Sequence, residues 1–241
     1  MLSTSDLTFI EKKGITAEMI DAQLKRFEVG FPFLKINAVA TIGNGIKAFS
    51  PEETAACVKA WSDFQQTGKA IEKFVPASGA ASRMFKNMFA FASSGKDAPT
   101  TDFEKEYFEN ITKFAFYADL NNACRKLYRS NVQELMSAGR YVDVVKAMLE
   151  PEGLNYGFLP KALLKFHKTT GGNAHTPLEE HLEEGAQYAA DKNRKVNLHF
   201  TVSPEHKAEF EKLLTAKLPI YEQVWGVKYN VTMSEQKSST D

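Results

Sequence analysis

Three strand patterns separated by helical patterns constrain the fold of this chain more than any other feature. Segments 73–76, 196–202 and 227–233 are short and either apolar or alternately apolar and polar, as β-strands are. The helical patterns begin near Phe85, at Thr176 and at Ser203, and the last two reach about Asp191 and Lys217. Strands that alternate with helices pair in parallel, because a long crossover brings the chain back to the same edge. We therefore predict an α/β fold with a mainly parallel sheet and crossover helices.

Capping signals predict further helices near the start of the chain. The stretch Ser50-Pro51-Glu52-Glu53 combines an N-cap serine, a first-turn proline and a glutamate that completes a capping box. Thr16 is placed to cap the helix before it. The three expected helices end near Gly14, Gly30 and Gly68, and residues 31–46 are expected to form an extended loop.

Residues 102–149 also carry apolar side chains at helical spacing. We therefore expect a helical N-terminal extension at residues 1–70, followed by an α/β domain at residues 71–241. A helical insertion at about residues 100–150 interrupts that domain.

Composition excludes several classes of protein. Thirty basic and thirty acidic residues cancel, which argues against nucleic-acid and membrane-surface partners. The longest stretch without a charged side chain, residues 36–46, has eleven residues and cannot span a bilayer as a helix. The two cysteines, Cys57 and Cys124, do not form a disulfide framework. We expect a soluble, cytoplasmic protein.

The segment between the first strand and the next helix carries the main chemical signal. It consists of five small residues and a glycine: Ala77, Ser78, Gly79, Ala80, Ala81 and Ser82. Small side chains let a ligand approach the backbone, and amides at a helix start favour an anion such as a phosphate chain. Arg83 follows directly, where we expect the first turn of the helix, and could grip the same phosphates. The alternative is a tight turn with Arg83 on a solvated face.

Other phosphate-binding and hydrolytic motifs are absent from the sequence. There is no G-x-x-x-x-G-K-[ST] motif, and Gly43-Asn44-Gly45 lacks the third glycine of a dinucleotide fingerprint. Ser78 lacks the G-x-S-x-G context of a hydrolase nucleophile.

The segment Ala77–Met84 resembles the signature loop of sugar-nucleotide pyrophosphorylases, which are nucleotidyltransferases, usually written A-[AG]-G-x-G-T-R-[LM]. Ser78 and Ala81 depart from that pattern, and Ala81 replaces a glycine that relaxes the loop. The family's second motif, P-K-x-L, is similar to the sequence around Pro160 and Lys161. Helices of roughly 70 residues intervene here, so the resemblance requires an insertion.

The resemblance implies a nucleotide-diphospho-sugar transferase-like fold and a specific reaction. A sugar-1-phosphate would attack the α-phosphorus of a nucleoside triphosphate and release pyrophosphate, with Mg²⁺ as the cofactor. Arg83 and Lys161 would be catalytic and hold the phosphates, while the loop from Ala77 to Ser82 would cradle the nucleotide. Gln236 would read an edge of the nucleobase, with simple disorder of the polar tail as the alternative. The protein residues that would hold the metal are unknown.

The whole chain also resembles the N-terminal part of a larger bacterial family known as a domain of unknown function. Segments 74–91, 159–164 and 176–190 carry this likeness. It implies that the α/β domain is incomplete at its C-terminus.

Two alternatives stay open. The first is a metal site built from His167, His175, His181 and Glu184. Its simpler alternative is that the glutamates in the first half of the helix, Glu184 included, are solvated and stabilise the helix N-terminus. A non-catalytic nucleotide-binding or protein-interaction domain competes with the enzyme. The oligomeric state is not predicted.

Overall fold

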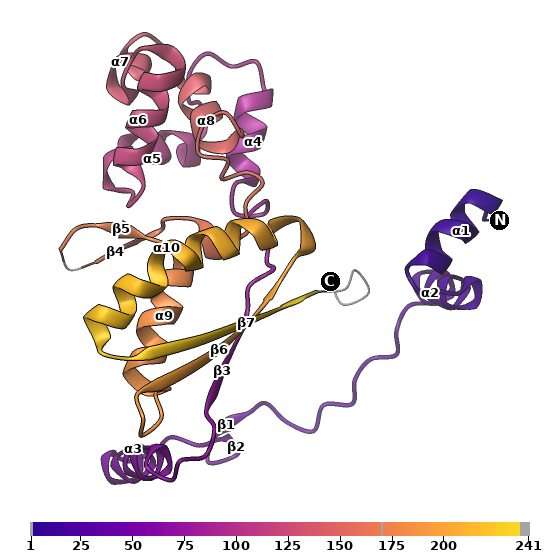
Figure 1. Cartoon of the computed structure of the whole chain (residues 1–241). Coiled ribbons are helices and arrows are strands. Elements are labelled where there is room, and N and C mark those ends of the chain that lie inside the picture. Colours follow the sequence, from indigo (N-terminus) through magenta and orange to yellow (C-terminus); the bar gives the residue numbers. More distant parts are fainter. Residues whose placement is uncertain (1, 170, 237–241) are drawn as a thin grey trace. The chain divides into compact units, whose positions relative to one another are not determined.

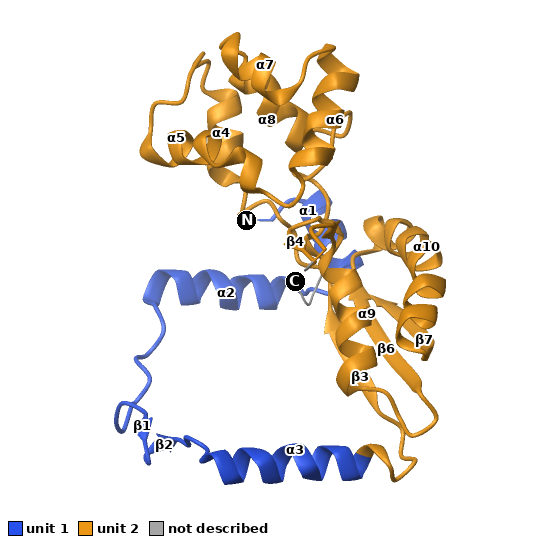
Figure 2. Ribbon diagram, turned by 90° about the vertical axis from the view of Figure 1, so that its left-hand side faces the viewer, with its two compact units in different colours: residues 1–64, 237–241 blue, residues 65–236 orange. Residues whose placement is uncertain are grey.

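The computed structural model describes residues 2–169 and 171–236 of the 241-residue chain (Figure 1). Contacts divide the chain into two compact units (Figure 2). The first covers residues 1–64 and 237–241, and the second covers residues 65–236. No helix among the described residues is long and apolar enough to cross a membrane.

The first unit contains helices and two very short strands. Its helices are α1 (Thr4–Lys12), α2 (Ala17–Val29) and α3 (Pro51–Gln65), the last of which ends at the boundary between the units. The expected loop at residues 31–46 contains the parallel pair β1 (Thr41–Ile42) and β2 (Gly45–Ile46), which the sequence did not predict. None of these described helices has a buried residue, so packing within this unit contributes little to its helices.

The predicted caps in this unit are confirmed. The hydroxyl of Thr16 accepts from the Met19 amide at 3.3 Å. Ser50 and Glu53 exchange two hydrogen bonds: the Glu53 amide donates to the Ser50 hydroxyl at 3.2 Å, and the Ser50 amide donates to Glu53 at 3.0 Å. Because caps depend only on residues three apart, the sequence reveals them directly.

The second unit is built on the predicted parallel sheet. Strands β3 (Glu72–Pro76), β6 (Lys195–Val202) and β7 (Lys228–Glu235) lie in the order β3-β6-β7, and both pairings are parallel (Figure 1). Val75 lies opposite Phe200, which lies opposite Met233. All three carboxyl ends therefore lie at the same edge of the sheet. The mixed α/β class and the parallel pairing are confirmed.

Helices α9 (Pro177–Tyr188) and α10 (Lys207–Trp225) pack on one face of this sheet. The sheet core joins the alternate, buried side chains of β6 to those of both helices. It includes Val196, Leu198, Phe200, Val202, Leu178, Leu182, Phe210 and Leu214. The intervening side chains of β6 point to the opposite face, which α9 and α10 leave uncovered.

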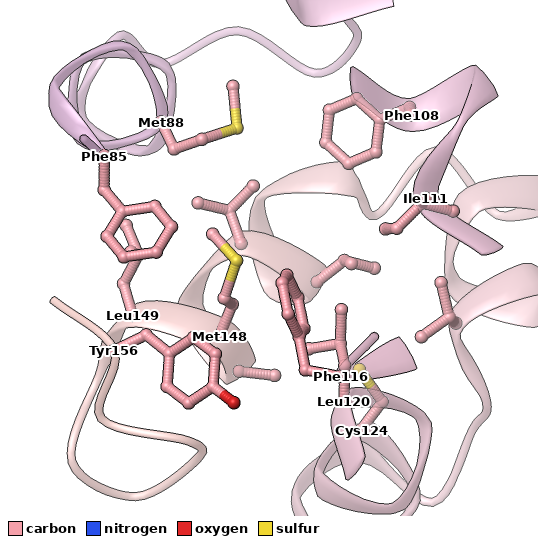
Figure 3. Close-up of a cluster of buried hydrophobic side chains, with 14 of the residues drawn as sticks. Phe85, Met88, Phe108, Ile111, Phe116, Leu120, Cys124, Met148, Leu149 and Tyr156 are labelled. Carbon is pink, nitrogen blue, oxygen red and sulfur yellow. The ribbon is translucent and has the colours of Figure 1, made fainter. Parts of the chain in front are cut away.

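The predicted insertion at about residues 100–150 forms a second core, which also takes in the helix after the first strand; the expectation that this helix packs on the sheet is wrong. Its helices are α4 (Lys86–Ser93), α5 (Asp102–Glu109), α6 (Tyr117–Tyr128), α7 (Val132–Ser137) and α8 (Tyr141–Leu149), with the short 3-10 turn η1 (Ile111–Lys113) between α5 and α6. Figure 3 shows Phe85, Met88, Phe116 and Met148 among the side chains gathered in this helical core. α8 supplies five buried residues, which places it at the centre of the packing.

Two short elements connect the helical core back to the sheet. The 3-10 turn η2 (Lys161–Leu163) follows Pro160, and the hairpin of β4 (His167–Lys168) and β5 (Ala174–His175) precedes α9. The sequence did not predict this hairpin, because two-residue strands carry no periodicity to detect.

Several predicted boundaries were wrong. α10 begins after a 3-10 turn (Pro204–His206) and continues past the expected end at Lys217, through Pro219, to Trp225. A proline inside a helix lowers the stability of that helix by about 3 kcal/mol. Here the apolar side chains on both sides of Pro219 pack against the sheet core, and this packing offsets the cost. α3 and α9 end about three residues earlier than expected, at Gln65 and Tyr188.

Gly153 provides a test of the packing at the end of α8. A Cβ atom at this position would lie 1.9 Å from the Ala147 carbonyl oxygen, which is fixed by its hydrogen bond with the Leu154 amide. We expect Gly153→Ala to lower the free energy of unfolding by about 2–3 kcal/mol, because backbone cannot move aside as a side-chain end can. Chemical denaturation measures this. The control is Gly79→Ala, where the added methyl meets no atom within 4 Å; equal stability of both variants would contradict the packing described.

Glu104 should make the stability of the helical core depend on pH. The amides of Thr100 and Thr101 donate to its carboxylate at 2.7 and 2.9 Å, and Lys96 lies 3.3 Å away. These hydrogen bonds lower the pKa of Glu104 from 4.5 to about 2. Because the folded-state pKa is the lower one, the stabilisation is complete above about pH 4.5 and is lost as the pH falls toward about 2.

We therefore expect Glu104→Gln to lower the melting temperature at neutral pH, and the difference from the wild type to shrink between about pH 5 and about pH 3. The matched control is Glu109→Gln on the same helix, whose side chain is exposed. A Glu104→Gln effect that stays constant over this range would contradict the assignment.

Candidate functional site

The predicted loop begins at the carboxyl end of β3. The Ala77 amide still donates to the Thr201 carbonyl of β6 at 2.8 Å, and the chain then leaves the sheet. Ala77 is buried in the sheet core, and Ala81 is buried in the helical core. Residues 78–80 cross between the two cores, with Gly79 and Ala80 exposed and Ser78 half-buried. The small residues at the two ends of the loop are thus packed, and the middle is open to solvent.

The structure brings the loop and the P-K-x-L segment together. The Lys161 amide donates to the Gly79 carbonyl at 3.0 Å, and Ala80 and Pro160 form an antiparallel bridge. Helices α4 to α8 lie between these two stretches in the sequence. The two motifs that the resemblance singled out are therefore neighbours in space.

The loop presents backbone donors to solvent. Within the described part of the chain, the amides of Ser78, Gly79 and Ala80 donate to no protein acceptor. A Cβ atom on Gly79 would meet no atom within 4 Å, so the space beside this residue is open. Consecutive backbone amides without protein acceptors are groups that can bind an anion.

Ala81 occupies the position of the loop glycine without backbone strain. It is not among the described residues with positive φ. Its carbonyl accepts from the Met84 amide at 2.9 Å and from the Phe85 amide at 3.4 Å. Ser82–Phe85 therefore form a hydrogen-bonded turn, and α4 starts only at Lys86. The expectation that Arg83 lies in the first turn of the helix is wrong, since Arg83 belongs to the turn before it.

The two candidate cations are both available to a ligand. The Arg83 and Lys161 side chains are exposed, and neither forms an ion pair or a side-chain hydrogen bond with any described residue. The neighbouring lysines differ from them: Lys165 pairs with Asp119 at 2.8 Å, and Lys168 donates to the Lys113 carbonyl at 3.2 Å.

Gln236 lies beside the loop. Its amide donates to the Val202 carbonyl at 2.8 Å, which continues the β6–β7 pairing by one residue. The Ser78 hydroxyl donates to the Gln236 side-chain oxygen. The sheet thus places Gln236 next to the loop, although the two are at opposite ends of the domain sequence. The rest of the polar tail, residues 237–241, lies outside the described residues.

The uncovered sheet face carries polar side chains that we did not predict as site residues. His199 hydrogen-bonds with Thr232 at 2.7 Å and with Ser234 at 2.8 Å. The Phe74 ring stacks on the His199 ring at 5.5 Å. Alternation along residues 196–202 is the signal that could have placed His199 on this face.

The histidines of the alternative metal site are divided between two carboxylates. His175 and His167 lie 2.5 and 3.2 Å from Glu180, whereas His181 lies 3.1 Å from Glu184. Glu184 also pairs with Lys73, and this contact lowers the pKa of its carboxyl. No group of three or more His, Cys, Asp or Glu side chains in the described residues could hold a metal ion.

Comparison with known proteins identifies the family. A family model described as Domain of unknown function (DUF4301) matches residues 3–241. Comparisons with curated proteins and with solved structures gave no match. The match covers nearly the whole chain, and the chain therefore belongs to the DUF4301 family of domains of unknown function.

Proposed function

We propose that this domain binds a nucleoside triphosphate at the loop of residues 77–82 and transfers its nucleotidyl group to a sugar-1-phosphate. One observation carries the proposal: the Gly79–Lys161 hydrogen bond places the two motifs of the nucleotidyltransferase resemblance side by side at the carboxyl edge of a parallel sheet. Ligands of open α/β sheets bind at that edge.

The loop backbone supplies the phosphate contacts. The amides of Ser78, Gly79 and Ala80 have no acceptor among the described residues, and a Cβ atom on Gly79 would meet no atom within 4 Å. A phosphate oxygen can therefore approach the main chain and accept from these amides.

Arg83 and Lys161 supply the positive charge. The sugar-phosphate oxygen attacks the α-phosphorus, the bond from that phosphorus to the bridging oxygen breaks, and pyrophosphate leaves with the electron pair. This chemistry depends on positioning and on stabilising negative charge. The two cations are exposed and unpaired among the described residues, so they can bind the β- and γ-phosphates without first breaking an ion pair.

Gln236 is the candidate reader of the nucleobase. The Ser78 hydroxyl donates to its side-chain oxygen, and this hydrogen bond orients the side-chain amide beside the loop. A side-chain amide fixed in this way donates to a carbonyl on a base edge.

The described residues do not fit a metal centre held by protein ligands. Glu235, at the carboxyl end of β7, is paired with Lys207 at 2.9 Å. Mg²⁺ supplied with the nucleotide would neutralise phosphate charge, as in other phosphoryl-transfer sites.

A second candidate function is binding of a nucleotide without catalysis, or contact with another protein. The lack of a metal-binding carboxylate group in the described chain favours it. Thermal shift with nucleoside triphosphates separates the candidates: ligand at 100 times its Kd adds about 2.7 kcal/mol of stability. Stabilisation without pyrophosphate release supports the binding domain, and no response to any triphosphate contradicts the proposed site.

Removing either cation should suppress the reaction. We expect Arg83→Ala and Lys161→Ala each to reduce pyrophosphate release by a factor of roughly 30 to 1,000, equal to about 2–4 kcal/mol of barrier. The melting temperature should not change, since neither side chain is packed or paired within the described chain. Lys212→Ala, an exposed lysine of α10, is the matched control. Turnover at the wild-type rate in both loop variants would contradict the proposed roles.

A methyl group on Gly79 should block the ligand without disturbing the fold. Gly79→Ala keeps the melting temperature within about 3 °C of the wild type or raises it, because the added methyl meets nothing and reduces the freedom of the unfolded chain. We expect its affinity for the triphosphate to fall about tenfold or more, which is the effect of losing one charge-assisted hydrogen bond. Isothermal titration calorimetry measures it; unchanged affinity would show that phosphates do not approach this backbone.

A further inference from the structure

A cavity of about 570 Å³ lies among the helices of the helical core, next to the turn of residues 82–85. Met84 and Phe85 of that turn line one wall. Phe103 and Tyr107 of α5 contribute further rings, as do Phe114, Phe116 and Phe166. The size and the aromatic lining are typical of a pocket for a small organic molecule.

The rings form a continuous aromatic surface. Phe114 stacks on Phe116 at 5.2 Å with their planes 5° apart, and Tyr107 lies 5.2 Å from Phe114. The centroid of the Phe166 ring lies 6.4 Å from that of Phe116 and 6.3 Å from that of Phe85. Phe103 and Met84, at the rim, are 45% and 47% exposed. Large apolar side chains are therefore exposed to water at the mouth of the pocket, and a bound ligand would cover them.

Among the residues that line the pocket, Glu106 is the one with a charged side chain. The Tyr107 hydroxyl donates to the Met148 sulfur at 3.0 Å, and burial keeps the pKa of Tyr107 above its ordinary value, so this group stays neutral. The Asn110 side-chain nitrogen donates one hydrogen to the Glu106 backbone carbonyl at 2.8 Å, and the Asn110 side-chain oxygen is an acceptor beside it. The Glu106 carboxylate forms no ion pair or hydrogen bond with any described residue.

We propose that this pocket binds a protonated organic amine with an aromatic or apolar body, at a site separate from the nucleotide loop. The rings attract a cation through their faces and pack against the apolar body. The Glu106 carboxylate and the Asn110 oxygen accept from the ammonium group. A neutral molecule of the same shape leaves the carboxylate without a partner, and an anionic molecule is repelled by it.

Three probes with the same ring test the proposal: tryptamine, which is a cation, 3-methylindole, which is neutral, and indole-3-acetate, which is an anion. Titration of the full chain is followed by ligand-observed NMR. We expect tryptamine to bind about tenfold more tightly than 3-methylindole, and indole-3-acetate to bind most weakly.

Variants assign the selectivity to the pocket. Glu106→Gln should remove the advantage of tryptamine and leave 3-methylindole unchanged, while Glu109→Gln, on the same helix but outside the pocket, should change neither. Phe103→Ala, at the exposed rim, should weaken both probes without unfolding the protein.

Several outcomes would overturn the proposal. Lack of tryptamine binding at millimolar concentration would show that the pocket is closed or filled by another segment or a second copy. Preference for indole-3-acetate would assign an anionic ligand, and equal effects of the two glutamate variants would move the site elsewhere. Nucleotide affinity in Glu106→Gln should equal that of the wild type, so the failure of this proposal and that of the nucleotide site are distinguishable.

Discussion

The backbone contact between Gly79 and Lys161 joins the two cores of the second unit. The chain leaves the sheet after Ala77 and returns beside the same loop at Pro160, so the whole helical insertion is closed by this contact. Each crossing is anchored at both ends. Ala77 and Ala81 lie in the sheet core and the helical core on the way out, and Ala162 and Leu164 occupy the same two cores on the way back. Without this pairing, the helical core would be connected to the sheet only by two loop segments that do not hydrogen-bond to each other.

The same arrangement explains the composition of the loop. The alanines at the two ends of the loop fit between packed elements, where a larger side chain would displace a neighbour. The residues between them, 78–80, have small side chains or none, so they cover little of the backbone. Ala81 shows why alanine suits one end of the loop. The residue is 1% exposed, and its carbonyl accepts the hydrogen bonds of the turn before α4. Glycine at that position would lose packing in the helical core, which accounts for the departure from the nucleotidyltransferase pattern without invoking backbone strain.

Local signals in the sequence predicted most of the regular structure, and they failed where long-range packing decides. The caps at Thr16 and Ser50 and the alternation along residues 196–202 depend on neighbours within a few positions, and the structure confirms them. The end of α10 is different. Pro219 indicates a break, and only the burial of apolar side chains beyond it against the sheet continues the helix to Trp225. The two-residue strands of the β4–β5 hairpin likewise exist because of pairing, without a sequence pattern of their own.

The sequence by itself determined the α/β class and the parallel direction of the sheet, and it singled out the small-residue loop and its arginine as a candidate site. Those features follow from side-chain spacing and residue type, which are local. Only the tertiary structure decided that Lys161 and Gln236 lie beside that loop, and that α5 and the turn at Met84 enclose an aromatic pocket with Glu106 in its lining. These are contacts between residues that are far apart in the chain. They are set by which faces of the sheet and helices bury each other, and a linear pattern does not record that choice.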